Sequence, residues 1–186
     1  MKEAISKRNR ILKPKKALLL AFGQDYEAQV SAIRTDITKL SSYDAPILRL
    51  DSDILKHPCV YYHDQKDIGV SDKFFMFRFQ SPPNPAHPEE LEVENVAALA
   101  LIHELTHASF GAVDHYRADL TPVNALDGHK PDDLLGYLLK DYKKLREKAG
   151  AALMIKNADS YLLFAHLAVT GDVDISPLYP KSLWDA

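Results

Sequence analysis

The sequence predicts an α+β fold in which a small antiparallel sheet packs on a central helix and further helices complete a single domain over residues 1–186. Three observations predict this class. Apolar residues recur every three or four positions in several long stretches, and short runs rich in β-branched and aromatic residues follow one another between residues 41 and 79. The chain also lacks internal repeats and any break in composition that would mark a second domain.

Composition and charge are those of an ordinary globular protein. Of the 186 residues, 46% are hydrophobic and 26% are charged, and the formal net charge is −3. This mild negative charge argues against a nucleic-acid partner, although basic residues gather near the N-terminus. We interpret residues 1–14 as a flexible, solvated basic arm of the domain.

Targeting signals and cysteine content indicate the cellular compartment in which the protein is expected. The apolar run at residues 17–22 is too short for the core of a secretory signal, and no run approaches the roughly 20 apolar residues of a membrane span. Cys59 is the single cysteine, so no intramolecular disulfide can form. We therefore expect a protein of the cytoplasm, or one exported by a specialised secretion route, with no membrane partner.

Each element follows from a local pattern. Apolar periodicity predicts helices, alternating or β-branched runs predict strands, and proline clusters predict rigid loops. Gly111 is expected to end the helix that precedes it. The expected elements are a helix over 15–40, strands at 46–50, 60–62 and 74–79, a proline-rich loop over 81–88, a helix over 90–109, a structured loop over 114–129, and helices over 132–148 and 151–169.

The predicted helix at 90–109 carries a His-Glu-x-x-His motif, formed by His103, Glu104 and His107. Residues four apart on a helix share a face, so the two imidazoles can bind one metal ion while Glu104 lies beside it. Burying these groups among Ala, Leu and Ile would be costly without such a partner. The motif predicts a Zn²⁺ site and a zincin-like fold, and a chance match on a helix with two surface histidines is the alternative.

A catalytic zinc site of this kind needs a third protein ligand. The metzincin pattern is excluded, because Phe110 and Val113 stand where it requires glycine and histidine. Glu147 lies in a charged run that is better explained as a solvated helix face. Asp114, just beyond the expected turn at Gly111, is the nearest carboxylate, and three further residues remain alternatives, namely His115, Asp119 and His129.

The segment 101–114 (LIHELTHASFGAVD), together with 157–161 (NADSY), resembles the deuterolysin or aspzincin family of zinc metalloendopeptidases. The resemblance extends over roughly residues 60–168 and includes the segment Asp67–Phe75. It implies that His103, His107 and Asp114 bind zinc. It also implies that Glu104 is the general base and that the substrate is a protein or peptide.

The chain departs from the family's GTxDxxYG pattern, with Ala112, Arg117 and Ala118 at its Thr, Tyr and Gly positions. The family's oxyanion donor is a tyrosine, so Tyr116, one position out of register, and Arg117 are both candidates for that role. In lysine-specific members an aspartate and a glutamate hold the substrate lysine. Asp159 matches the aspartate, whereas Leu162 replaces the glutamate.

Two further functions remain open on the sequence alone. A degenerate zincin fold would bind a metal or a partner without cutting, as the changed loop motif allows. An effector or toxin would direct real peptidase activity at one target protein and would be accompanied by an immunity or inhibitor protein. The motif gives no indication of oligomeric state.

Overall fold

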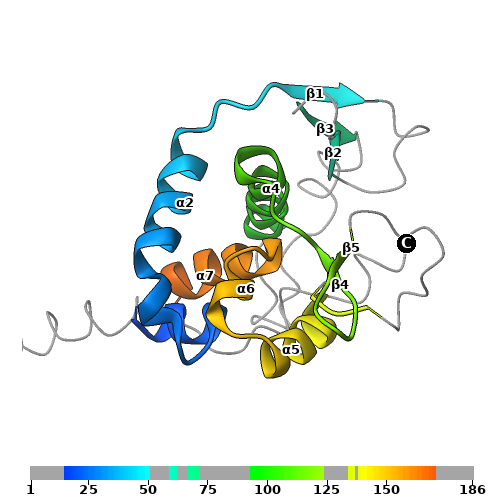
Figure 1. Cartoon of the computed structure of the whole chain (residues 1–186). Helices are drawn as coiled ribbons and strands as arrows, with labels where there is room; N and C mark the ends of the chain where they lie inside the picture. The colour runs from blue at the N-terminus through cyan, green and yellow to red at the C-terminus, as the bar shows by residue number, and fades with distance from the viewer. Residues whose placement is uncertain are drawn as a thin grey trace, which may run out of the picture. The chain divides into compact units, whose positions relative to one another are not determined.

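The computed structural model describes residues 15–50, 59–62, 67–71, 93–123, 134–136 and 138–170. Within these ranges the chain is mostly helical and also contains a three-stranded and a two-stranded sheet (Figure 1). The described residues divide into two compact units, one of residues 36–112 and one of residues up to 35 with those from 113 onward. The mixed helix and sheet class is confirmed, and the single domain over 1–186 stays a prediction.

Some predicted features lie outside the described residues. They are the basic arm at 1–14, the strand at 74–79, the proline-rich loop at 81–88 and the alternative ligand His129. Among the helices in the described part of the chain, none is both long and apolar enough to cross a bilayer.

The three-stranded sheet belongs to the unit of residues 36–112. It consists of β1 (Ile47–Leu50), β2 (Cys59–Tyr62) and β3 (Asp67–Ser71), with β3 in the centre. β3 is antiparallel to β2 and parallel to β1. The expected antiparallel sheet is therefore mixed. A parallel pair needs a crossover of a dozen or more residues, and the chain between β1 and β3 is long enough to supply one.

Helix α4 (Val93–Phe110) packs against β2 and β3 of this sheet (Figure 1). Ile68 and Val70 of β3 are buried, and Leu101 and Leu105 of α4 pack on them, together with Ala45. The helix is rich in Ala and Leu, which have high helix propensity. Its bounds agree with the prediction of a helix over 90–109. The apolar contact with β3 fixes the helix that carries the His-Glu-x-x-His motif.

Gly111 ends α4, as predicted, by adopting a left-handed conformation with φ of +71°. Its N–H donates to the carbonyl of His107 at 3.0 Å, and the N–H of Ala112 donates to the carbonyl of Thr106 at 3.3 Å. These bonds satisfy carbonyls at the end of the helix, as left-handed C-terminal caps generally do. The turn directs the chain back over the last turn of α4.

The helix expected over 15–40 is interrupted. Residues 15–22 are helical, Gly23 has φ of +93°, and a 3₁₀ turn η1 (Tyr26–Gln29) leads into α2 (Val30–Ser42). The prediction of one continuous helix was wrong because the apolar period continues through a glycine that takes a conformation which only glycine adopts readily.

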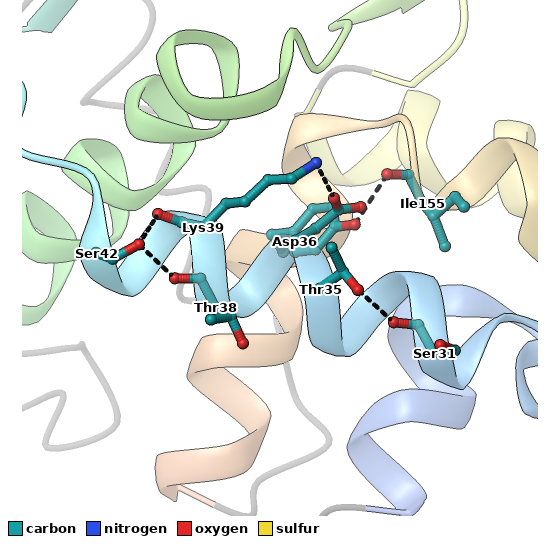
Figure 2. A network of polar contacts seen from close by, with 8 residues as sticks. Ser31, Thr35, Asp36, Thr38, Lys39, Ser42 and Ile155 are labelled. Carbon is teal, nitrogen blue, oxygen red and sulfur yellow. Dashed lines mark hydrogen bonds and ion pairs between the residues drawn. The ribbon is translucent and has the colours of Figure 1, made fainter.

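Polar side chains on α2 mostly bond within the helix (Figure 2). The Thr35 hydroxyl donates to the Ser31 carbonyl at 3.0 Å, and the Ser42 hydroxyl donates to the Thr38 carbonyl at 2.9 Å. The Lys39 ammonium lies 3.4 Å from the Asp36 carboxylate. Such exposed pairs contribute little to stability.

The other unit contains the two-stranded sheet and the C-terminal helices. β4 (His115–Tyr116) pairs with β5 (Pro122–Val123), and α5 (Leu138–Lys148), α6 (Ala151–Met154) and α7 (Ala158–Thr170) follow. The helix expected over 151–169 is thus divided at residues 155–157. The Asn157 Oδ1 accepts a hydrogen bond from the N–H of Ser160 at 3.2 Å and so caps the start of α7.

Contacts between residues far apart in the sequence close this unit. The Phe22 and Tyr161 rings meet edge to face with centroids 5.2 Å apart, and the buried Tyr142 hydroxyl donates to the Ala21 carbonyl. The Asp25 Oδ1 accepts a hydrogen bond from the N–H of Ala151 at 2.9 Å and so caps α6. Residues 15–35 are therefore held by the C-terminal helices.

We expect Gly111→Ala to lower the free energy of unfolding by roughly 1–2 kcal/mol, because alanine is strained in the left-handed region. Nothing lies within 4 Å of a Cβ built at this position, so the loss reports backbone strain and not a clash. Gly111→Asn is the matched control and should cost less, since asparagine tolerates this conformation. Urea unfolding measures both values. An alanine variant as stable as the wild type would contradict the expectation.

We expect Tyr142 to make stability fall at alkaline pH. Burial raises the pKa of the Tyr142 phenol, so the folded protein keeps a proton that the unfolded chain loses near pH 10. The contribution is complete below about pH 10. It then falls as pH rises, by up to roughly 1.4 kcal/mol per pH unit.

Tyr142→Phe tests this expectation. The variant should be about 1–2 kcal/mol less stable at neutral pH, because the Ala21 carbonyl loses its donor. Its stability should fall less steeply above about pH 10 than that of the wild type. Tyr43→Phe, at a half-buried tyrosine, serves as the control. Equal alkaline slopes for Tyr142→Phe and the wild type in denaturant titrations would refute the expectation.

Candidate metal centre

The two histidines and the glutamate of the motif lie on the last three turns of α4. His103 is buried, with 7% of its surface exposed, while Glu104 and His107 are half-buried. The His103 and His107 ring centroids lie 5.0 Å apart with an angle of 76° between the planes. The helix therefore presents both imidazoles on one face, as the four-residue spacing predicted.

The turn at Gly111 orients the second histidine. It brings the carbonyl of Ala112 to 2.7 Å from His107 Nδ1. A carbonyl only accepts hydrogen bonds, so His107 Nδ1 carries the proton, and in the neutral ring the lone pair belongs to Nε2. This is the arrangement found around metal-binding histidines, whose second nitrogen donates to a carbonyl or carboxylate that fixes the ring.

The two Nε2 atoms converge. His103 Nε2 and His107 Nε2 lie 3.3 Å apart. Two histidine nitrogens bonded to one tetrahedral zinc ion at roughly 2.0–2.1 Å would be about 3.3 Å from each other. A proton on His103 Nε2 can also join the pair by a hydrogen bond, and a metal ion would replace that proton. The spacing therefore fits a metal site without rearrangement of the helix.

A carboxylate completes the set. Asp114 follows the Gly111 turn, and one ligand atom each from His103, His107 and Asp114 lie within 4.8 Å of one another. Asp114 is half-buried. Two imidazoles and one carboxylate are a donor set that zinc accepts with one position left for water. Among the described residues, the group brought together is the one that the sequence predicted.

The two candidate oxyanion donors differ in environment. Tyr116, on β4, is 1% exposed, and within the described ranges its hydroxyl has no hydrogen-bond partner. Burial raises the pKa of Tyr116, and the nearby Asp114 carboxylate raises it further, so the hydroxyl is protonated at neutral pH. Arg117 is exposed at the start of the turn between β4 and β5. Tyr116 is thus the buried donor beside the third candidate ligand.

Asp119 and His115, the two alternative ligands among the described residues, are not part of this group. Asp119 is exposed and accepts hydrogen bonds from the N–H and the hydroxyl of Thr121, which lower the pKa of Asp119. These hydrogen bonds give Asp119 a structural role in the turn between β4 and β5. His115 is half-buried on β4 and is not among the three grouped residues.

Asp159, the predicted substrate-binding residue, lies in the first turn of α7 and is 2% exposed. A carboxylate at this position interacts favourably with the helix dipole whether or not it meets a ligand. Its contact with a substrate lysine stays a prediction.

Three features of the centre were not predicted from the sequence. They are the Ala112 carbonyl behind His107, the close packing of Gly136 on Asp114, and the bonds from the Asn157 side-chain amide to the backbone around Asp114. The first had a signal in the sequence, because a left-handed turn after a helix brings the following backbone onto the last turn. The other two join residues far apart in the chain, and local patterns give no sign of them.

No family model, curated protein or solved structure matches this chain significantly. The resemblance to deuterolysins therefore depends on the motifs themselves. The arrangement of His103, His107 and Asp114 in the structure is an independent reason to expect a metal centre at this place.

Proposed function

We propose that this chain is a zinc-dependent metalloendopeptidase that uses His103, His107 and Asp114 as ligands. The observation that carries the proposal is the 3.3 Å convergence of the two histidine Nε2 atoms, with His107 fixed by the Ala112 carbonyl. A metal ion held in this geometry would explain why the His103 imidazole is buried on an apolar helix. The Glu104 carboxylate beside it favours a hydrolytic enzyme over a protein that only binds metal.

A bound zinc ion would lower the pKa of a coordinated water toward about 7 and would polarise the carbonyl of the peptide to be cut. Glu104 follows His103 directly and lies half-buried on the same helix. Its carboxylate is the general base that accepts the proton of the attacking water and then returns it to the leaving amine.

Tyr116 is the preferred donor to the negative oxygen that develops during attack. Its hydroxyl is buried and keeps its proton at neutral pH, so it can donate. Preorganised donors of this type contribute roughly 3–4 kcal/mol to the transition state in other enzymes. Arg117 remains the alternative donor.

We expect zinc to stabilise the folded protein and a chelator to remove that stabilisation. A ligand that binds mainly the native state adds about 4 kcal/mol when its free concentration is 1,000 times Kd. Thermal unfolding with zinc and with excess chelator measures the effect. His103→Ala with His107→Ala should abolish the shift, whereas His115→Ala, at a half-buried histidine outside the group, should keep it. A wild type insensitive to both zinc and chelator would refute the metal site.

We expect Glu104→Gln to keep zinc and to lose peptidase activity by about 10²- to 10⁴-fold, since glutamine cannot accept the proton. The measurement is mass-spectrometric mapping of cuts in a complex peptide mixture, with zinc-loaded wild type and variant prepared in parallel. Glu147→Gln, at an exposed glutamate on α5, is the matched control and should cut like the wild type.

The pattern of cuts in the same experiment distinguishes the remaining hypotheses about substrate and activity. Cuts that cluster before lysine would support the predicted role of Asp159 in holding the substrate. A folded, zinc-loaded wild type that makes no cuts would favour a metal-binding protein without peptidase activity, or a peptidase restricted to one target protein.

A further inference from the structure

The side chain of Asn157 lies at the centre of a hydrogen-bond network around the backbone of the third candidate ligand. Asn157 is fully buried, with 0% of its surface exposed. Its Nδ2 lies 3.2 Å from the carbonyl of Val113, 3.5 Å from that of Asp114 and 3.0 Å from that of Gly136. One amide group therefore lies within hydrogen-bond distance of the carbonyls immediately before and after the Asp114 Cα, and of the Gly136 carbonyl.

The two ends of this side chain have separate tasks. Oδ1 accepts hydrogen bonds from the N–H of Ser160 at 3.2 Å and from its hydroxyl at 3.4 Å, which is the ordinary capping role at the start of α7. A serine, threonine or aspartate could cap equally well. Only the donors on Nδ2 require an amide, and they point to the segment that carries Asp114.

The main chain reinforces the same contact. The N–H of Val113 donates to the carbonyl of Lys156 at 2.8 Å, and the N–H of Ala158 donates to the carbonyl of Val113 at 3.2 Å. These bonds flank Asn157 and form a short parallel bridge between residues 113 and 157. Val113 is thereby fixed directly before Asp114.

Gly136 closes the network from the other side. A Cβ at this position would lie 2.7 Å from the Asp114 carbonyl oxygen and 3.0 Å from Asn157 Nδ2, and its φ of +102° is strained for any other residue. The backbone of Asp114 is therefore held by close packing as well as by hydrogen bonds.

We propose that Asn157 is a positioning residue, which holds the Val113–Asp114 backbone so that the Asp114 carboxylate is oriented for the metal before the metal binds. The inference rests on the proposed function, since it takes Asp114 as a ligand. Asn157 acts through Asp114 and does not itself contact the metal. Partners that orient ligands in this way typically change metal affinity by 10- to 100-fold when mutated.

The test compares metal binding by the whole chain and by Asn157→Ser, which keeps a capping oxygen and removes the amide donors. We expect the zinc Kd to rise by about 10- to 100-fold. The d–d absorption of bound Co²⁺ should shift toward that of Asp114→Ala. Ser160→Ala is the matched control, because it alters the Oδ1 side of the network alone, and its Kd and spectrum should remain those of the wild type.

A double-mutant cycle separates positioning from general destabilisation. In an Asp114→Ala background, Asn157→Ser should weaken zinc binding no further. An equal loss in both backgrounds, or an unchanged Kd and Co²⁺ spectrum in Asn157→Ser, overturns the proposal. A wild type that binds no metal defeats the proposed function together with this inference. Zinc binding that depends on Asp114 and not on Asn157 defeats this inference alone.

If Asn157→Ser does not fold, the wild type provides a second measurement. The side-chain amide resonances of Asn157 in a ¹⁵N-labelled protein should shift on addition of zinc and should stay in place when zinc is added to Asp114→Ala. Asn157 resonances that zinc leaves unchanged in the wild type would overturn the proposal.

Discussion

The hydrogen bond between His107 Nδ1 and the carbonyl of Ala112 is the interaction on which the candidate centre depends. It requires the chain to reverse directly after α4, and Gly111 makes this possible by adopting a positive φ. The bond fixes one tautomer of His107 and aims its Nε2 at that of His103. The same reversal delivers Asp114 within reach of both histidines. The turn at Gly111 thus determines both the tautomer of His107 and the position of Asp114.

The sequence predicted those parts of the fold that depend on local pattern. The strands at β1 and β2, the motif helix α4 and its end at Gly111 follow from runs of residues that are neighbours in the chain. β3 was not predicted as a strand, because five residues that include Gly69 give a weak signal. Its parallel pairing with β1 is set by the path of the intervening chain, which periodicity does not reveal.

The residues of the candidate site also divide into those that local sequence patterns predict and those that depend on contacts distant in the sequence. His103, Glu104 and His107 could be placed together because helical spacing is a local property. The choice of Asp114 over the other candidate ligands came from the family resemblance, because spacing alone left those candidates open. The Oδ1 of Asn157 caps the helix that begins beside it, which is a local interaction, whereas its Nδ2 bonds to residues more than 40 positions earlier. Sequence patterns predict which side chains can bind a metal, and tertiary contacts determine how firmly the backbone beneath them is held.

The contacts that close the unit around residues 15–35 have a consequence for biosynthesis. Ala21 is bonded to Tyr142, Asp25 caps the helix that begins at Ala151, and Phe22 packs on Tyr161. During translation the N-terminal segment can form these hydrogen bonds only after at least 120 further residues have been added to the chain. Such non-local closure is slow, and it leaves apolar side chains such as Phe22 exposed on the nascent chain.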